Sequence, residues 1–398
     1  MTRTLRIQFL AAASIFLING IIVGAWFARI PVVREQTHLT VQELGFAFIF
    51  GTIGAVLTMG VGGWLGGKLG SHVMAPAATL GCGASLVLIA GAWNFWSLVV
   101  ALLCFGITQG TMDVMMNANG VAVERAGAGP IISRLHAMWS VGAFLGALTS
   151  TQSAAFGVGV LPEFIGIAVL SGSAAFLMTQ TLMHDKHTGD GPSFRLPNGR
   201  LLLVGALCAA GLLAETSATD WSGTYLTTDM HVDEGMASLG VTVFTGCMAL
   251  SRLVGDRLTQ IIGTARLVAG GSAMAAVGLV LVLGPQWMPA AIVGFALIGL
   301  GLAGVVPSYF RAGGNQPGVP SSVGIAAVST VGYAGGLIGP PVIGTIGGAF
   351  TLRIALLILL ALMVILVILS PRVLANTPAT EGPETADAAE TGTRTAEA

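Results

Sequence analysis

Twelve long apolar segments follow one another along the chain, and they constrain the fold more than any other feature. They cover residues 7–29, 43–66, 73–93, 96–121, 131–156, 162–183, 201–226, 236–257, 265–284, 288–310, 321–346 and 350–370. A helix crosses the bilayer core with roughly 20 apolar residues. Only 9% of the residues are charged, against about 25% in a soluble domain. Because backbone groups in lipid must be satisfied internally, the segments predict an all-α membrane protein with twelve transmembrane helices.

The positions of Lys and Arg predict the orientation of these helices. With a cytoplasmic N-terminus, 14 of the 17 basic residues fall on the cytoplasmic side. These are Arg3, Arg6, Lys68, Arg125, Arg134, Lys186, Arg195, Arg200, Arg252, Arg257, Arg266, Arg311, Arg372 and Arg394. Arg29, Arg34 and Arg353 fall outside. Since cytoplasmic loops are enriched in basic residues, both termini are expected in the cytoplasm. We take residues 7–29 as a spanning helix, because the run lacks the small-residue cleavage site of a signal peptide.

One polar stretch, residues 184–200, divides the apolar segments six and six. Two internal matches support a duplication. Residues 66–69 (Gly-Gly-Lys-Leu) match 255–258 (Gly-Asp-Arg-Leu) at an offset of 189, and residues 140–142 (Ser-Val-Gly) match 330–332 (Thr-Val-Gly) at an offset of 190. Such repeats are typical of secondary transporters. We predict an N-terminal six-helix bundle over 1–183, a cytoplasmic loop over 184–200, a C-terminal six-helix bundle over 201–371 and a disordered cytoplasmic tail over 372–398.

The segment after the second helix, Gly63-Trp64-Leu65-Gly66-Gly67-Lys68-Leu69-Gly70, resembles the loop signature of the major facilitator superfamily. Gly67 stands where that signature has Asp. The copy in the second half, residues 255–258, keeps this acid as Asp256, followed by Arg257. The resemblance implies two pseudo-symmetric six-helix bundles that expose a central site to each side in turn. It also implies a gating role for the charged residues of the two copies, which are Lys68, Arg252, Asp256 and Arg257.

Three further patterns resemble the bacterial MosC-like/YbjJ-like branch of that superfamily, relatives of fucose-type sugar–proton symporters. They are residues 24–31 (Gly-Ala-Trp-Phe-Ala-Arg-Ile-Pro), 113–119 (Asp-Val-Met-Met-Asn-Ala-Asn) and 136–142 (His-Ala-Met-Trp-Ser-Val-Gly). The resemblance implies a proton-coupled secondary transporter of a small polar, sugar- or polyol-like solute in the bacterial inner membrane. The fifth segment lacks the Gly-Pro of drug–proton antiporters, because Ala147 follows Gly146.

Acidic residues inside the membrane are expensive, so their default interpretation is functional. Asp113, Asn117 and Glu124 lie on one stripe of the fourth segment, with Gln109 one turn before. In the superfamily this helix lines the central cavity, where a partly desolvated carboxylate can take up a proton. We predict Asp113 as a proton-coupling residue, with Gln109 and Asn117 binding solute. The alternative is a structural acid paired with Arg125 or Arg134, which is the interpretation we favour for Glu124.

The seventh segment places acids, hydroxyls and aromatic rings together over residues 215–225. Glu215 lies deep in the membrane and is predicted both to bind solute and to couple protons. Trp221 and Tyr225 either cover a solute ring or belong to the aromatic belt at the membrane surface. We include Trp221 among the predicted solute-binding residues.

Polar residues of the first and fifth segments complete the predicted solute site. Asn19 lies near the centre of the first segment, where fucose-type symporters carry an acid. His136 and Trp139 lie one turn into the fifth segment. His136 either shuttles protons near neutral pH or packs as a hydrogen-bonded ring.

Arg29 and Asp220 both fall toward the outer face, on helices that are repeat equivalents. They are predicted to form a gating ion pair between the halves that favours the inward-open state. Arg29 extending to lipid headgroups is the alternative.

The remaining function classes are less well supported. Export of amphipathic compounds is the alternative transport function, and the missing Gly-Pro argues against it. A membrane enzyme would need a catalytic cluster, and only His136 and Glu124 come close. No Gly-x-x-x-x-Gly-Lys-Ser/Thr loop for ATP occurs, and the four cysteines have no metal-like spacing. We expect no enzyme activity and no cofactor besides a proton gradient. The expected partners are a small-molecule substrate and the lipid bilayer, with no nucleic acid, and the protein is expected to be monomeric.

Overall fold

The computed structural model describes residues 2–128, 131–178, 181–184, 199–316, 319 and 321–375. The first half contains α1 (Arg3–Gln36), α2 (Val41–Leu69), α3 (Ser71–Ala90), α4 (Phe95–Val123), the π-helical turn η1 (Glu124–Ala128), α5 (Ile132–Ala155) and α6 (Val160–Met178). The second contains α7 (Gly199–Thr228), α8 (Glu234–Ile262), α9 (Thr264–Leu283), α10 (Met288–Leu302), α11 (Val305–Gly314), α12 (Ser321–Ala349) and α13 (Leu352–Leu374). No strand occurs in the described ranges.

Within the described residues, eleven stretches of helix are long and apolar enough to cross a membrane, counting α10 and α11 as one. The helix that falls short of this criterion is α5, which carries Arg134, His136 and several hydroxyl residues. It packs along α1, where the α-carbon hydrogens of Gly142 and Gly146 face backbone atoms of Leu17 and Ile21. The prediction of an all-α membrane protein is confirmed.

The predicted span 288–310 is two helices rather than one, because α10 ends at Leu302 and α11 begins at Val305. Pro307 explains the break. Its ring nitrogen has no hydrogen to donate, and the ring clashes with the carbonyl of the residue four positions before, which is Ala303. Gly304 stands at the joint as the residue before α11. The counterpart in the first half, α4, runs unbroken for 29 residues.

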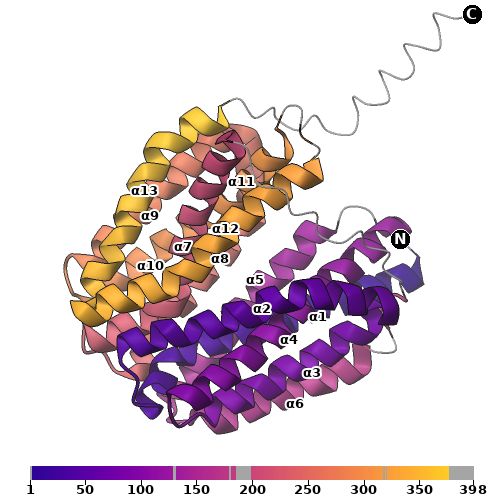
Figure 1. The fold of residues 1–398 in the computed structure, drawn as a ribbon, viewed down its shortest axis with the longest axis horizontal. Coiled ribbons are helices and arrows are strands. Elements are labelled where there is room, and N and C mark those ends of the chain that lie inside the picture. The colour runs from indigo at the N-terminus through magenta and orange to yellow at the C-terminus, as the bar shows by residue number, and fades with distance from the viewer. Residues whose placement is uncertain are drawn as a thin grey trace, which may run out of the picture.

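Helices α1–α6 pack into one bundle and α7–α13 into another (Figure 1). Each bundle pairs its helices in the same way, with α1 against α5, α2 against α4, α7 against α12 and α8 against α10. The exact boundaries predicted for the bundles, loop and tail stay predictions. Helix α7 already begins at Gly199, α13 continues to Leu374, and residues 185–198 and 376–398 lie outside the described ranges.

The internal repeat is real, but the offset predicted from the sequence is one helical turn too short. Val41 and Glu234 begin α2 and α8, and Ser71 and Thr264 begin α3 and α9; both pairs are 193 positions apart. Packing agrees, because Gly106 faces the backbone of Gly51, while Gly299, 193 positions later, faces that of Phe244. The two sequence matches, at offsets of 189 and 190, are slips of four and three residues, which keep nearly the same helix face because a turn holds 3.6 residues.

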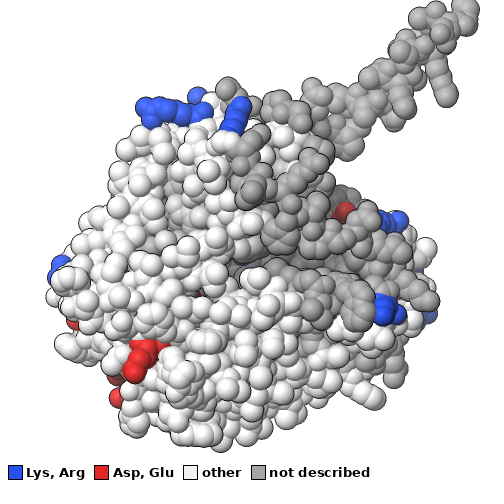
Figure 2. Space-filling view, viewed as in Figure 1, with Lys and Arg blue, Asp and Glu red and all other residues white. Residues whose placement is uncertain are grey.

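The two halves touch at the end of the molecule away from the termini (Figure 1). A β-carbon on Gly45 of α2 would lie 2.7 Å from the carbonyl oxygen of Pro340 in α12. The hydroxyls of Thr151 in α5 and Thr242 in α8 are 2.8 Å apart. In Figure 2, Lys and Arg lie mainly on the side of the termini, Asp and Glu mainly at the opposite end, and uncharged surface lies between. Among the described residues, the Gly45–Pro340 and Thr151–Thr242 contacts close the halves at the end away from the termini.

Candidate functional site

A cavity of about 520 Å³ lies between the halves and is lined by helices of both. Its walls are Asp113, Met116, Ile132, His136, Ala137 and Trp139 from the first half, and Leu212, Glu215, Arg252, Val306, Pro307, Phe310 and Tyr333 from the second. Five of the predicted site residues, Asp113, His136, Trp139, Glu215 and Arg252, therefore share one cavity. Such a volume is in the range of small-molecule sites.

The charged centre of the cavity is an ion pair between α7 and α8. The Arg252 guanidinium donates to Glu215 Oε1 at 2.9 Å, and its other terminal nitrogen donates to the Ser140 hydroxyl of α5 at 3.0 Å. The side chains of Arg252 and Glu215 are 25% and 19% exposed. Arg252 thus connects the two halves across the cavity. Sequence grouped Arg252 with the gating motif, whereas its contacts place it in the cavity beside Glu215.

Asp113 faces the same cavity from α4 with a neutral partner. The Asn117 amide donates to the Asp113 backbone carbonyl at 2.8 Å and to its carboxylate at 3.3 Å. Within the described ranges, no basic side chain lies within ion-pair distance of this carboxylate, so neither Arg125 nor Arg134 pairs with it. Asn117 is a neighbour of Asp113 rather than one of the residues lining the cavity.

Asn19 and Gln109 form a closed amide pair inside the first half. Each side-chain NH₂ donates to the other's oxygen, at 2.9 and 3.0 Å, and Trp139 Nε1 donates to Asn19 Oδ1 at 2.7 Å. Asn19 is fully buried. The prediction that Asn19 and Gln109 bind solute is not supported in this conformation, because their amide groups are already paired and neither lines the cavity.

His136 and Glu124 differ in their roles. The imidazole of His136 lines the cavity and packs edge-to-face on Phe16, with ring centroids 5.3 Å apart. Glu124 accepts hydrogen bonds from the backbone N–H groups of Ile131 and Ile132 at 2.8 and 3.3 Å, where α5 begins. Glu124 is structural, as expected, but it caps a helix instead of pairing with an arginine.

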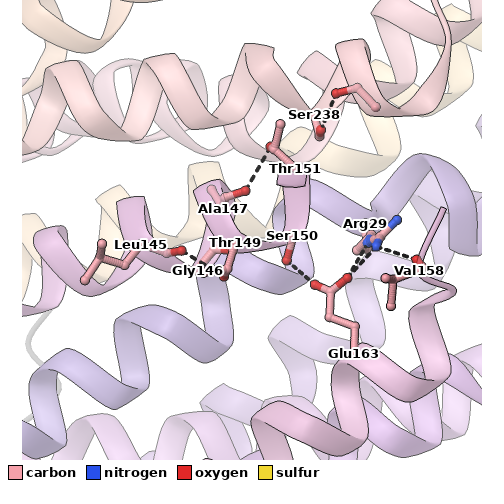
Figure 3. A network of polar contacts seen from close by, with 11 residues as sticks. Arg29, Leu145, Gly146, Ala147, Thr149, Ser150, Thr151, Val158, Glu163 and Ser238 are labelled. Carbon is pink, nitrogen blue, oxygen red and sulfur yellow. Dashed lines mark hydrogen bonds and ion pairs between the residues drawn. The ribbon is translucent and has the colours of Figure 1, made fainter. Parts of the chain in front are cut away.

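Arg29 does not pair with Asp220, so the predicted ion pair between the halves is wrong for this conformation. Its Nε donates to Glu163 of α6 at 2.8 Å, and its Nη2 donates to the Val158 carbonyl at 2.8 Å and to Glu163 (Figure 3). Ser150 of α5 donates to the other carboxylate oxygen. The side chains of Arg29 and Glu163 are 2% and 6% exposed. This network lies wholly within the first half, and burial also excludes contact of Arg29 with headgroups.

Trp221 is a contact between the halves rather than a cavity residue. It is fully buried and lies edge-to-face against Phe48 of α2, with ring centroids 5.7 Å apart. Its prediction as a solute-binding residue is not supported here. Tyr225 is also buried, and its hydroxyl donates to the Val282 carbonyl at 3.0 Å, so it does not belong to a surface belt.

The gating motif lies within helices rather than in loops. Residues 66–69 form the last turn of α2, and α8 continues past residues 255–258 to Ile262. Lys68 and Arg257 are exposed, and the side chain of Asp256 lies outside the described ones. Their gating role, and that of Asp220, stays a prediction.

Sequence reasoning missed Ser140, Phe310 and Tyr333 as site residues. The repeat could have found two of them, because Phe310 and Tyr333 lie 193 positions after Asn117 and Ser140. The shorter offset hid this correspondence. Among the described residues, no group of three His, Cys, Asp or Glu side chains could hold a metal ion.

Comparisons with known proteins agree with this architecture. The profile of the Major Facilitator Superfamily matches residues 7–312 and 203–396. An uncharacterized MFS-type transporter of Yersinia pestis is 33% identical over 85% of this chain and 89% of its own length. The membrane protein MosC of Rhizobium meliloti is 32% identical over 90% of this chain and 88% of its own length. An uncharacterized transporter of Sinorhizobium fredii is 31% identical over 93% of this chain and 99% of its own length.

Solved structures of transporters share the fold. A variant of the nucleoside transporter NupG superposes with a TM-score of 0.74 at 14% identity, covering 92% of this chain and 99% of its own. A bacterial homologue of the human lysosomal transporter Spinster gives 0.71 at 13% identity, covering 96% and 100%. The family match and these relatives define a polytopic membrane transporter, not an enzyme. The chain belongs to the major facilitator superfamily.

Proposed function

We propose that this chain transports a small polar solute, sugar- or polyol-like, together with protons by alternating access. The observation that carries the proposal is the cavity between the halves, where Asp113 faces Glu215 and Arg252 from the opposite side. Carboxylates and a guanidinium can hydrogen-bond solute hydroxyls, and Trp139, Phe310 and Tyr333 supply faces for a ring. Proton coupling is assigned to Asp113 and Glu215.

The proton step follows from what closure would do to the cavity. Glu215 has Arg252 to balance its charge, whereas the described neighbours of Asp113 offer only the Asn117 amide. Closing the halves would take Asp113 out of water, and an uncompensated buried carboxylate is strongly unfavourable. We therefore propose that the halves close over solute only after Asp113 takes up a proton. A solute hydroxyl could replace the Ser140 hydroxyl as acceptor for Arg252. Solute binding would then break a hydrogen bond between the two halves.

The orientation completes the proposal. With the termini in the cytoplasm, the open end of the cavity faces inward, and the closed contacts at Gly45 and Thr151 form the outer barrier. We also propose that the protein is a monomer and that it lies in a bacterial inner membrane. Cysteine labelling of the exposed Trp93 and Arg372 positions from either side of intact cells tests the orientation. Labelling of Trp93→Cys from outside and Arg372→Cys only after permeabilisation is expected; the reverse pattern contradicts it.

Export of an amphipathic compound is the second candidate, and the cavity lining favours it at one point. Met116, Ile132, Leu212, Val306 and Phe310 give the cavity a largely apolar wall. Polarizable and apolar side chains of this kind can accommodate varied amphiphiles. The two candidates differ in the chemistry of the solute and in the direction of net movement.

Transport in proteoliposomes distinguishes the candidates. Purified protein is reconstituted with a pH-sensitive dye inside, and sugars, polyols and cationic dyes are added in turn. Proton movement driven by a sugar or polyol supports the symport proposal. Proton movement driven only by cationic dyes supports export. Solute uptake that is indifferent to the proton gradient overturns the coupling.

A further inference from the structure

A second large recess lies on the surface of the C-terminal half, next to the cavity. It has a volume of about 730 Å³ and runs between α8 and α9 to the break between α10 and α11. We call it the lateral groove. Arg252 and Pro307 line both the groove and the cavity, so they form part of the wall between the two. The groove owes its shape to the interrupted helix, since Gly304 and Pro307 both lie along it.

The walls of the lateral groove combine an apolar floor with basic side chains. Leu250, Val254 and Met274 line it and are 62%, 50% and 40% exposed, which makes this a surface for hydrocarbon rather than for water. Arg266 at the start of α9 and Arg311 of α11 line the same groove. The groove therefore offers an apolar channel and positive charge in one place.

The N-terminal half lacks these charges at the corresponding positions. With the structural offset of 193, Arg266 corresponds to Val73 and Arg311 to Ala118. The helix that corresponds to α10 and α11 is the unbroken α4. The arginines and the break are therefore particular to one half, and they are not a by-product of the duplicated fold.

We propose that the lateral groove binds one anionic glycerophospholipid, with an acyl chain on the apolar floor and the phosphate held by Arg266 and Arg311. Basic recesses between membrane helices suit anionic headgroups. Guanidinium groups bind phosphate oxygens through paired hydrogen bonds. Because Arg252 lies in the shared wall, the bound lipid would rest against α8, the helix that carries Arg252. The proposal does not depend on which solute the cavity takes.

Lipid titration of the purified full-length protein, followed by native mass spectrometry, tests the site. Phosphatidylglycerol and phosphatidylcholine of identical chains are the probes. We expect preferential binding of phosphatidylglycerol, and a loss of about fivefold in its affinity for each arginine removed in Arg266→Ala and Arg311→Ala. Arg372→Ala is the matched control, since Arg372 is exposed on α13 and does not line the groove. Equal binding of both lipids by the wild type, or an equal loss in the control, overturns the proposal.

A filling variant tests the acyl channel without changing charge. A β-carbon at Gly270, which lines the groove, would meet nothing within 4 Å, so Gly270→Phe can extend into the groove without disturbing α9. We expect it to lose phosphatidylglycerol binding while its thermal unfolding in detergent is unchanged. Gly166→Phe on α6, where a β-carbon also meets nothing, is the control and should bind normally. Unchanged binding in Gly270→Phe places the lipid elsewhere and overturns the groove assignment.

Discussion

Two ion pairs, one in each half, show how the same residue types serve different ends. Arg29 and Glu163 lie in the N-terminal half with 2% and 6% of their side chains exposed, enclosed by Ser150 and the Val158 carbonyl. Glu215 and Arg252 lie in the C-terminal half, 19% and 25% exposed, and face the cavity. The first pair has its hydrogen bonds satisfied within one bundle. The second reaches Ser140 in the other bundle and is open to exchange partners with a solute.

The polar amides extend this contrast. Asn19, Gln109 and Trp139 satisfy one another inside the N-terminal half, and at the position of Gln109 the repeat places Leu302 in the C-terminal half. Asp113, in turn, corresponds to Val306, and both line the cavity. Asp113 is therefore a charge of the N-terminal half that has no counterpart in the C-terminal half. A polar residue in the membrane indicates function only when its hydrogen bonds remain open to the cavity.

Breaking the enclosed ion pair should have the largest effect on stability. Arg29→Ala leaves Glu163 buried without its cation, and the expected loss in the free energy of unfolding is about 3–5 kcal/mol. Thermal unfolding in detergent measures it. Arg29→Met combined with Glu163→Met should recover most of the loss, since apolar replacement of a whole buried pair is often neutral. An Arg29→Ala protein as stable as wild type contradicts a structural role.

Breaking the cavity pair should instead remove transport from a folded protein. Arg252→Ala leaves Glu215 unpaired and removes the bond to Ser140, and we expect initial uptake to fall roughly 100-fold, about 2.7 kcal/mol. Uptake per folded molecule in proteoliposomes is the measurement. Arg353→Ala, whose side chain bonds the Gly284 carbonyl away from the cavity, serves as control and should transport normally. Normal uptake in Arg252→Ala removes this pair from the mechanism.

The hydrogen-bonded cluster of Asn19, Gln109 and Trp139 gives a smaller test of the difference between enclosed polar groups and groups that face the cavity. Asn19→Leu leaves the Gln109 NH₂ group and the Trp139 ring nitrogen without their acceptor, so we expect about 2 kcal/mol lower stability. The KM for solute should stay within twofold of wild type, because Asn19 does not line the cavity. A tenfold rise in KM with unchanged stability would restore Asn19 to the solute site.

The smallest expected effects come from removing the hydroxyl of Tyr333 or of Tyr225. Tyr333 lines the cavity, whereas the Tyr225 hydroxyl donates to a buried carbonyl. Tyr333→Phe should raise KM about threefold with little change in stability, since one hydrogen bond contributes about 1 kcal/mol or less. Tyr225→Phe should lower stability by about 1 kcal/mol and leave KM unchanged. A raised KM in Tyr225→Phe together with lower stability in Tyr333→Phe would contradict the position given to the cavity.

The helices and the acids Asp113 and Glu215 of the cavity could be predicted because apolar length and buried charge are properties of single segments, and the family resemblance added His136 and Trp139. The hydrogen-bond and ion-pair partners of these residues could not be predicted. Depth in the membrane alone does not distinguish Asp220 from Glu163 as the partner of Arg29, and the turn before α6 brings Glu163 into reach. The repeat was matched one turn out of register because residues four apart share a helix face. That slip concealed the correspondence of Asp113 with Val306. Pro307 carried a signal for the broken helix that apolar length obscured.

Asp113 tests the central claim most directly. Solute-driven proton uptake is measured in proteoliposomes for wild type, Asp113→Asn and Glu43→Gln, the last an exposed carboxylate that caps α2 far from the cavity. We predict that wild type and Glu43→Gln move protons with the solute. Asp113→Asn should bind solute and exchange it across the membrane, yet move no protons. Undiminished solute-driven proton uptake in Asp113→Asn would contradict the account and transfer the proton site to Glu215.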